Sequence, residues 1–99
     1  MNDEKKVLDF VVGLCVRHGA ERVVLFGSRA RGDGHELSDF DIAIFGIKDT
    51  KRKLDIRETC DESAPTLKTI DIVFAQDAGE KLLQNIKKDG IILYERNKD

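Results

Sequence analysis

FGSRARGDGHELSDFDIAIF (residues 26–45) joins two apolar runs through a polar loop. Gly27 and Ser28 directly follow the first run, and Asp39 and Asp41 stand where the second run begins. Two like charges one residue apart at the start of a buried strand repel each other. Their placement therefore needs a reason other than packing.

The spacing of the two aspartates predicts that they act together. In a strand over residues 40–45, alternate side chains share a face, so Asp39 and Asp41 point one way and the apolar side chains between them point into the core. Their Cα atoms would be ~6.6 Å apart. Two carboxylates at 4 Å and an effective dielectric near 20 repel by about 4 kcal/mol, and a divalent cation between them reverses that sign. Mg²⁺ suits such a site, because it takes one or two carboxylates and fills its other positions with water and phosphate oxygens.

The segment IDIVFA, residues 70–75, repeats the pattern, with Asp71 near the start of another predicted strand. If this strand lies beside residues 40–45, Asp71 joins Asp39 and Asp41 at one end of the sheet. Three carboxylates so placed suit phosphoryl transfer with two metal ions. A single aspartate at the mouth of a strand is commonly a solvated residue or a turn acceptor, so the repetition is what favours a metal site.

The loop after the first run offers groups for binding phosphate. Gly27 has no Cβ, so a ligand or another backbone can approach it closely, and Ser28 adds a hydroxyl and an amide. Arg29 and Arg31 add positive charge. If SRARG forms a helical turn, its free amides favour an anion such as a triphosphate. Taken alone, the loop could equally be a glycine-bearing turn with solvated arginines.

Two common phosphate-binding motifs do not fit this loop. GSRARG has the glycine spacing of a P-loop, but Asp33 stands where the lysine should be. GDGHEL has two glycines of a dinucleotide-binding fingerprint, but Leu37 replaces the third, and a strand follows instead of a helix.

Strands and helices are predicted to alternate along the chain. The join between the first two strands is too short for a crossover helix, so these strands should run antiparallel and make the sheet mixed. The prediction is an α/β (α+β) fold with a mixed sheet of about four strands and helices packed on it. Helices are expected over residues 4–18, 48–63 (with Leu54 and Ile56 facing inward) and 77–89 (starting at Asp77 and Glu80), and strands over residues 23–26, 40–45, 70–75 and 91–94.

Composition narrows the classes of function. The 99 residues, 40 % hydrophobic and 36 % charged, are enough for one domain over residues 1–99. The net charge of −2 argues against direct DNA binding, which needs a basic surface. The sequence has no apolar run long enough to span a membrane and no signal peptide, which predicts a cytoplasmic protein. Cys15 is expected in the core, and Cys60 is expected as a free thiol in a polar stretch.

The order GSRARG-x5-SDFDIAIF followed by IDIVF resembles the DNA polymerase beta-type nucleotidyltransferase superfamily, and the whole chain is similar to its minimal form, the MNT or MntA-like proteins. The resemblance implies the polymerase beta-like nucleotidyltransferase fold and transfer of a nucleotide from ATP or another nucleoside triphosphate, with Mg²⁺ (two ions) as cofactor. It implies catalytic and metal-binding roles for Asp39, Asp41 and Asp71, and nucleotide-binding roles for Gly27, Ser28, Arg29 and Arg31. In the family, the residue at the position of Asp71 also helps to deprotonate the acceptor hydroxyl.

The acceptor is expected to come from another protein, since few residues follow the last strand and larger relatives carry a further domain there. Minimal members often pair with a small all-helical HEPN protein as antitoxin and toxin, and characterised examples transfer AMP to a tyrosine of the toxin. The resemblance therefore implies such a partner. Two alternatives stay open: an antitoxin that acts by occlusion without catalysis, and a transferase for a small molecule such as an aminoglycoside.

Overall fold

The computed structural model describes residues 3–32 and 39–97, so Ser38 and the rest of the loop before it lie outside the described residues. The elements in chain order are α1 (Asp3–Arg17), β1 (Arg22–Phe26), α2 (Ser28–Arg31), β2 (Phe40–Phe45), α3 (Thr50–Ser63), β3 (Ile70–Phe74), the 3-10 helix η1 (Ala75–Asp77), α4 (Glu80–Asp89) and β4 (Ile91–Glu95). The predicted alternation of strands and helices is confirmed. Across the described residues, no helix is long and apolar enough to cross a membrane.

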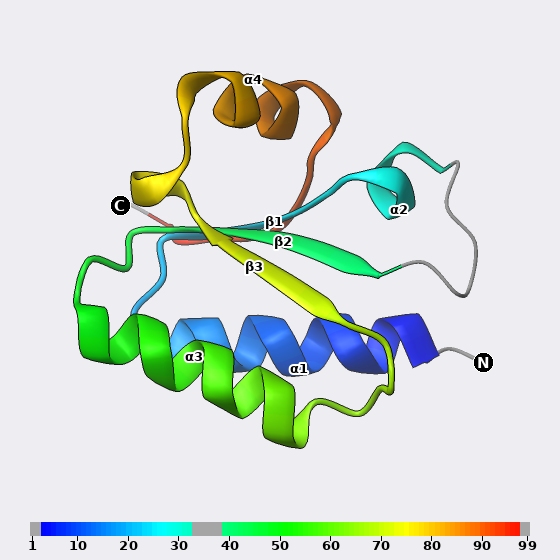
Figure 1. Cartoon of the computed structure of the whole chain (residues 1–99), viewed down its shortest axis with the longest axis vertical. Coiled ribbons are helices and arrows are strands. Elements are labelled where there is room, and N and C mark those ends of the chain that lie inside the picture. Colours follow the sequence, from blue (N-terminus) through cyan, green and yellow to red (C-terminus); the bar gives the residue numbers. More distant parts are fainter. Residues whose placement is uncertain (1–2, 33–38, 98–99) are drawn as a thin grey trace.

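The four strands form one mixed sheet in the order β3-β2-β1-β4 (Figure 1). β1 runs antiparallel to both β2 and β4, and β2 runs parallel to β3. The predicted antiparallel pairing of the first two strands is confirmed. These directions bring the end of β1 and the starts of β2 and β3 to the same end of the sheet.

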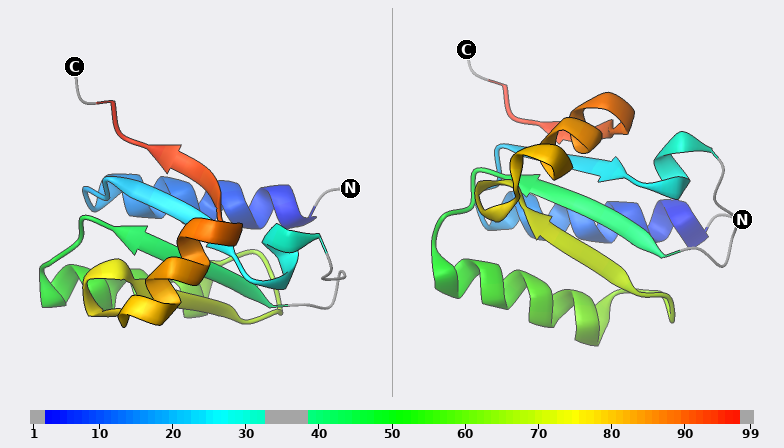
Figure 2. Two further views of the ribbon diagram at one scale, coloured as in Figure 1. Left: turned by 90° about the horizontal axis from the view of Figure 1, so that it is seen from above. Right: turned by 45° about the horizontal axis from the view of Figure 1, so that its top comes forward.

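Helices cover the two faces of the sheet unequally. α1 and α3 lie together on one face and α4 lies on the other, as the two views in Figure 2 show. The larger core cluster joins Val7 and Val11 of α1 to Phe40 and Ile42 of β2 and Ile56 of α3. A smaller cluster lies under α4 and comprises Val24, Ala43 and Ile86, with partly buried Phe26, Phe45, Leu82 and Leu83 around it. Because alternate residues of β2 face opposite ways, the α4 face is also the face of Asp41.

Three details differ from the sequence prediction. Leu54 is 52 % exposed, because residues two apart on a helix do not share a face and Ile56 already points inward. Cys60 is a free thiol as predicted but is buried, since it lies four residues after Ile56 on the same side of α3. Asp77 does not begin the last helix: it lies in η1, and its carboxylate accepts a hydrogen bond from Lys53 Nζ at 2.9 Å.

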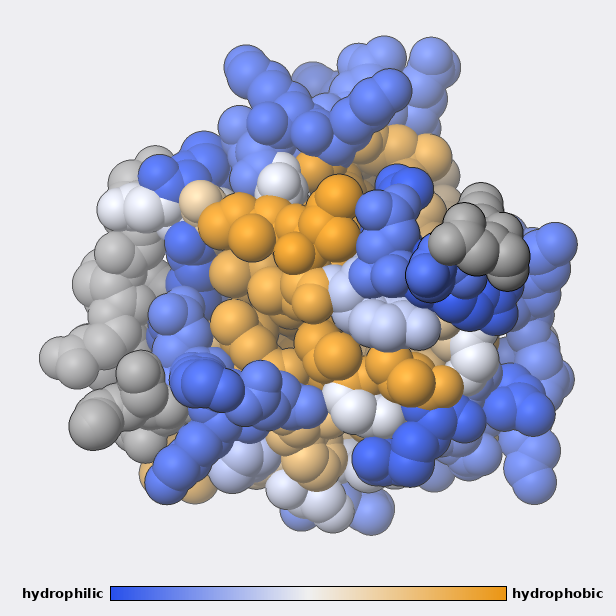
Figure 3. Space-filling model, turned by 180° about the vertical axis from the view of Figure 1, so that it is seen from behind, coloured by the Kyte–Doolittle hydropathy of each residue, from blue (hydrophilic) through white to orange (hydrophobic). Residues whose placement is uncertain are grey.

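An apolar surface lies on the side of the molecule opposite the view of Figure 1 (Figure 3). Ile91 and Ile92 of the edge strand β4 are 47 % and 55 % exposed. Leu8 and Val12 of α1 line a groove together with Leu93 of β4. We call these five residues the α1–β4 apolar surface.

Candidate active site

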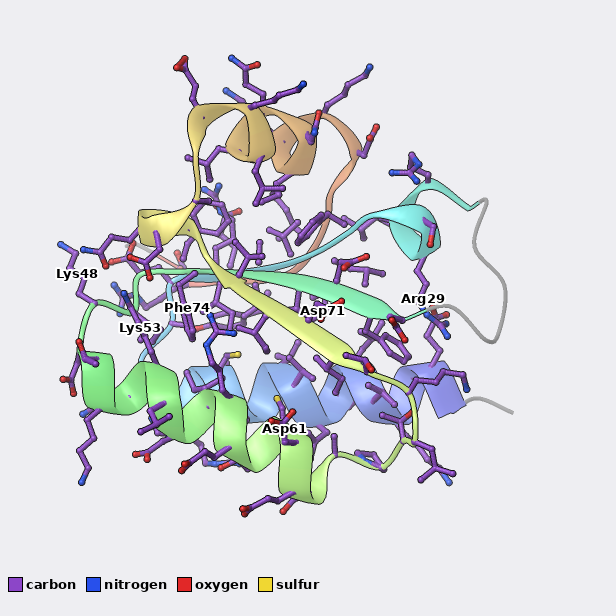
Figure 4. The ribbon with its side chains drawn as sticks, in the orientation of Figure 1. Arg29, Lys48, Lys53, Asp61, Asp71 and Phe74 are labelled. Carbon is purple, nitrogen blue, oxygen red and sulfur yellow. The ribbon has the colours of Figure 1, made fainter. Side chains whose placement is uncertain are left out.

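Asp41 and Asp71 are direct partners across two parallel strands, in the register Asp41↔Asp71. The two residues therefore share a face of the sheet, the face that also carries α4. Asp41 is half-buried and Asp71 is exposed; Figure 4 labels Asp71 on β3. The expectation that β3 lies beside β2, with its aspartate next to those of SDFD, is confirmed.

Asp39 stands just before β2 and is tied to the start of the neighbouring strand. Its Oδ1 accepts a hydrogen bond from the backbone N–H of Thr69 at 3.3 Å. Thr69 also accepts a bond from the N–H of Phe40 at 3.0 Å. These contacts hold Asp39 at the same end of the sheet as Asp41 and Asp71.

The electrostatics show that the charges of Asp39 and Asp71 act on Asp41. Burial raises the pKa of Asp41, and the charges of Asp71 and then Asp39 raise it further, while Arg31 lowers it. The half-buried carboxylate of Asp41 is therefore in a negative potential that one nearby cation only partly offsets. Such a position favours the binding of a further cation.

Gly27 explains how the β1 loop reaches these carboxylates. Phe26, the last residue of β1, pairs with Asp41, and Gly27 follows with φ +78°, a conformation that L side chains rarely adopt. A Cβ at Gly27 would overlap Asp41 Oδ2 and would lie 3.1 Å from its Cγ. The absence of a side chain at this position thus lets the loop pass directly over the carboxylate.

Ser28 begins the predicted helical turn, which is confirmed as α2. The turn is closed by bonds from the N–H groups of Ala30 and Arg31 to the carbonyl of Gly27, each 3.1 Å long. The first N–H groups of a helix have no carbonyl partner within it. Ser28 therefore places its hydroxyl and its backbone amide directly beside Gly27.

The two arginines of α2 go to different sides. Arg29 contacts Glu4 of α1 at 3.1 Å, and its guanidinium lies 4.0 Å from the centre of the Phe40 ring, on the face away from Asp41. Only 9 % of the Arg29 side chain is exposed. Figure 4 labels Arg29, which points from α2 toward α1. Arg31 lowers the pKa of Asp41 and lies 4.0 Å from Asp89 of α4. Of the two predicted nucleotide-binding arginines, the structure brings Arg31 to the carboxylates and packs Arg29 between α1 and β2.

The donor set fits Mg²⁺ in kind. Carboxylate oxygens are its preferred protein ligands, and one or two of them suffice when water and phosphate oxygens complete the shell. The neighbours Asp41 and Asp71 meet that need, with Asp39 at the same sheet end. In residues 3–32 and 39–97, no three His, Cys, Asp or Glu side chains form, as they stand, a group that could hold a metal ion. The three-carboxylate metal site therefore stays a prediction.

A pocket next to Asp71 was not predicted from the sequence. It has a volume of about 440 Å³ and lies along the outer edge of β3, where Arg57 and Asp61 of α3 face residues 69–73. Both α3 residues stand in a charged segment that reads only as a solvated helix. Their position beside Asp71 becomes visible only when α3 is packed against β3.

Comparison with known proteins gives the chain a family. Residues 14–99 match the family described as "Polymerase beta, Nucleotidyltransferase". A protein of Methanocaldococcus jannaschii named "Putative protein adenylyltransferase MJ0604" is 41 % identical over 58 residues. That stretch covers 57 % of this chain and 58 % of the relative, so the chain spans less than two thirds of the relative's length.

Solved structures share the fold. One described as "putative minimal nucleotidyltransferase" has a TM-score of 0.70 at 28 % identity and covers 92 % of this chain and 95 % of its own. A complex of tri-AMPylated Shewanella oneidensis HEPN toxin with MNT antitoxin matches with a TM-score of 0.70 at 18 % identity, covering 93 % of this chain and 72 % of that one. The second likeness shows the fold alone. Together with the family match, they confirm the predicted polymerase beta-like fold.

Proposed function

The chain belongs to the polymerase beta nucleotidyltransferase family, and from this premise we propose that it transfers a nucleotide, AMP from ATP, to a hydroxyl of a partner protein. One observation carries the proposal. Gly27, at the end of β1, passes over the carboxylate of Asp41, which is in register with Asp71. The loop that we propose to bind phosphate therefore lies next to a pair of acidic side chains.

We assign the metal-binding role to Asp39, Asp41 and Asp71. Mg²⁺ bound there would neutralise the charge of the triphosphate and of the departing pyrophosphate. The raised pKa of Asp41, caused by burial and by the two other carboxylates, supports a cation at this point. Asp39 and Asp41 would hold the nucleotide side of the site, and Asp71, the most outward of the paired acids, would face the acceptor.

The transfer itself exchanges one bond for another. The acceptor hydroxyl oxygen bonds to the α-phosphorus, the bond from that phosphorus to the oxygen bridging to the β-phosphate breaks, and pyrophosphate leaves. Asp71 takes the hydroxyl proton. Most of the rate would come from holding the groups in line and from neutralising charge.

Gly27, Ser28 and Arg31 are the proposed phosphate contacts. Gly27 and Ser28 would offer backbone amides and a hydroxyl, and Arg31 would offer a cation that already acts on Asp41. Nucleotide binding by Arg29 remains a prediction, and its contacts with Glu4 and Phe40 support a second role in positioning α2.

The proposed partner is a small all-helical protein of the HEPN type, with this chain as its antitoxin. The relative named as a protein adenylyltransferase and the fold shared with an MNT antitoxin complexed with an AMPylated HEPN toxin support this choice. The α1–β4 apolar surface also supports a protein partner, because exposed apolar surface of this kind marks interaction sites. The cytoplasmic location is part of the proposal and agrees with two free, buried cysteines.

A labelling experiment tests the proposal. The chain is incubated with Mg²⁺, labelled ATP and the candidate HEPN-type protein, and mass spectrometry locates the label. We expect one or more AMP groups on hydroxyl side chains of the partner and none with Asp41→Asn. Glu58→Gln is the matched control, since it removes one exposed carboxylate of α3 that is not among the proposed site residues. Absence of label with every nucleotide tried would refute transfer.

Occlusion is the second candidate function, and the α1–β4 apolar surface favours it. The double variant Asp39→Asn with Asp41→Asn separates the two in cells that express the partner. If neutralisation of the partner is lost while the complex still forms, catalysis accounts for it. If neutralisation survives, binding alone accounts for it.

A further inference from the structure

β3 is an outer strand of the sheet, and the pocket of about 440 Å³ along its free edge adjoins Asp71. Arg57 and Asp61 close the pocket from the side of α3, and residues 69–73 form its strand side. Apart from Asp71, no residue of the proposed nucleotide and metal site lines this pocket. It therefore borders the acid that would accept the proton and is separate from the loop that would hold the phosphates.

The hydrogen bonds show which backbone groups face the pocket. Phe40 N–H donates to Thr69 O, so the N–H and C=O groups of residues 69, 71 and 73 point toward β2. The groups of Ile70 and Ile72 therefore point outward along the free edge. Arg57 confirms this direction, because its guanidinium donates to Ile72 O at 3.0 Å. Arg57 thus occupies Ile72 O, while the N–H and C=O of Ile70 and the N–H of Ile72 have no hydrogen-bond partner among the described residues. Unpaired groups of this kind are a ready template for another strand.

A strand added at this edge would carry a side chain to Asp71. Directly opposite residues on paired strands share a face and have Cβ atoms about 4.5–5.5 Å apart. The residue opposite Asp71 would therefore project on the α4 face, where Asp41 and Asp39 also lie. A hydroxyl on that residue would stand next to the carboxylate that takes its proton.

The two charged residues of α3, Arg57 and Asp61, would contact the residues of the added strand that flank the one opposite Asp71. Arg57 is held by Ile72 O and by the ring of Phe74, whose centre is 5.0 Å away, so its positive charge is fixed in place. Asp61 lies one helical turn further along α3, on the same side of the helix. The pocket thus carries a cation near the middle of β3 and an anion nearer its start.

We propose that the β3 edge is the acceptor site: an extended polypeptide segment pairs with β3 and presents a Ser, Thr or Tyr hydroxyl to Asp71. An acidic residue of the segment contacts Arg57, and a basic residue contacts Asp61. This inference rests on the proposed function and names where its acceptor binds. In the transfer, the hydroxyl loses its proton to Asp71 as its oxygen bonds to the α-phosphorus of ATP and pyrophosphate leaves.

Synthetic peptides of seven residues test the site. Each has a central tyrosine, with an acidic residue on one side and a basic residue on the other, in both orders and with either charge neutralised. Transfer of AMP from labelled ATP with Mg²⁺ is measured for the wild-type chain, Arg57→Glu, Asp61→Lys and the control Glu58→Gln. We expect the wild type to prefer one charge order, and each charge reversal to lower kcat/KM for that peptide by about tenfold through KM, the size of a surface pair turned from attraction to repulsion.

Pairing along the strand is tested by N-methylation of the peptide. Methyl groups on the amides that would face β3 should abolish transfer, and methyl groups on the alternate amides should leave it, because only the former remove ladder hydrogen bonds. The Ile70 amide should shift in the NMR spectrum when the unmethylated peptide is added. Charge variants that act like wild type, equal effects of both methylation patterns, or an unmoved Ile70 amide would overturn the proposal.

The outcomes separate this inference from the function on which it rests. A chain that binds Mg²⁺ and ATP in a thermal-shift assay and labels a whole protein, but shows no charge preference and no Ile70 shift, keeps the function and loses the site. A chain that labels nothing loses the function. Preferential labelling of a nucleic acid hydroxyl would assign the edge to another acceptor class and overturn the peptide site.

Discussion

Replacing Asp41 by Asn should make the free protein more stable while abolishing its proposed activity. Asp41 is half-buried, is in register with Asp71 and shares the sheet end with Asp39. Asn has nearly the same shape and removes one of three neighbouring negative charges. The free protein therefore loses a repulsion that only a bound cation would otherwise relieve.

The expected size follows from the geometry. Neighbouring strands are about 4.7–4.9 Å apart, so the charges of Asp41 and Asp71 are about 5–6 Å apart. Their repulsion is about 3 kcal/mol at a dielectric of 20 and about 0.8 kcal/mol in water. Asp71 and Asp39 are exposed, so solvent screening puts the effective value near the lower figure. We expect Asp41→Asn to raise the free energy of unfolding by about 1 kcal/mol, or the melting temperature by about 4–8 °C for a domain of this size.

The effect has a defined pH dependence. Burial, Asp71 and Asp39 raise the pKa of Asp41, so the folded state holds a proton at pH values where the unfolded chain has released it. The stability linked to this proton is complete below the unfolded pKa, about 3.9, and is lost as the pH rises through the raised folded pKa. The advantage of Asp41→Asn should therefore be full at pH 7 and vanish as the pH falls toward 4.

Thermal unfolding of the wild type and of Asp41→Asn is followed by circular dichroism at pH 4–8, with and without Mg²⁺. At ten times its Kd, Mg²⁺ should stabilise the wild type by about 1.4 kcal/mol and Asp41→Asn by much less. Glu58→Gln, an exposed change of equal charge, should shift neither curve. A less stable Asp41→Asn at pH 7, or an advantage that does not depend on pH, would refute the idea that the carboxylates repel in the free protein.

Three further predictions test other contacts. Gly27→Ala should lower the free energy of unfolding by about 1–3 kcal/mol and abolish ATP binding, because its Cβ would meet the Asp41 carboxylate at a positive φ; chemical denaturation and a thermal-shift assay with ATP measure this. Arg29→Ala should lower the melting temperature by several degrees, through loss of the Glu4 contact and about 0.5–2 kcal/mol of stacking on the Phe40 ring, whereas Arg29→Lys should restore part of the loss. Burial raises the pKa of Cys15 to about 12 and that of Cys60 to about 11, so both thiols should resist a thiol reagent in the native protein. Since unfolded thiols ionise near pH 8.5, the unfolded state loses protons that the folded state keeps, and the free energy of unfolding should fall as the pH rises from about 9 to 11, less so in Cys60→Ser.

Local pattern was enough to predict most of the fold. FDIAIF and IDIVF are apolar over the length of a strand except for one aspartate each. The predicted positions of β2 and β3 are confirmed to within one residue. The buried face of α3 is less evident from the sequence, because the sequence of α3 is mostly charged and few of its residues are apolar. The buried face of α3 is set by Ile56 and Cys60, which are four residues apart. A prediction that assigns Leu54 to that face as well is therefore wrong.

The site was predictable where neighbouring residues decide it and not where packing does. Asp39 and Asp41 share a face because of strand geometry alone, and Gly27 lies at the end of the strand next to theirs. The separation of Arg29 from Arg31 depends on the position of α1, which supplies Glu4. The pocket of Arg57 and Asp61 likewise depends on how α3 packs against the edge of β3. Sequence spacing carries no information on either contact.

The direction of β1 determines where the site lies. Because β1 is antiparallel to β2, its end and the loop with Gly27 reach the start of β2, where Asp41 stands. Because β3 is parallel to β2, Asp71 arrives at that same end. A crossover helix between β1 and β2 would have made the two strands parallel. Gly27 would then lie at the opposite end of the sheet, away from all three acids. The short link between the first two strands is thus what brings the proposed phosphate-binding loop to the proposed metal-binding set, and the outer edge of β3 is where the proposed acceptor strand would reach Asp71.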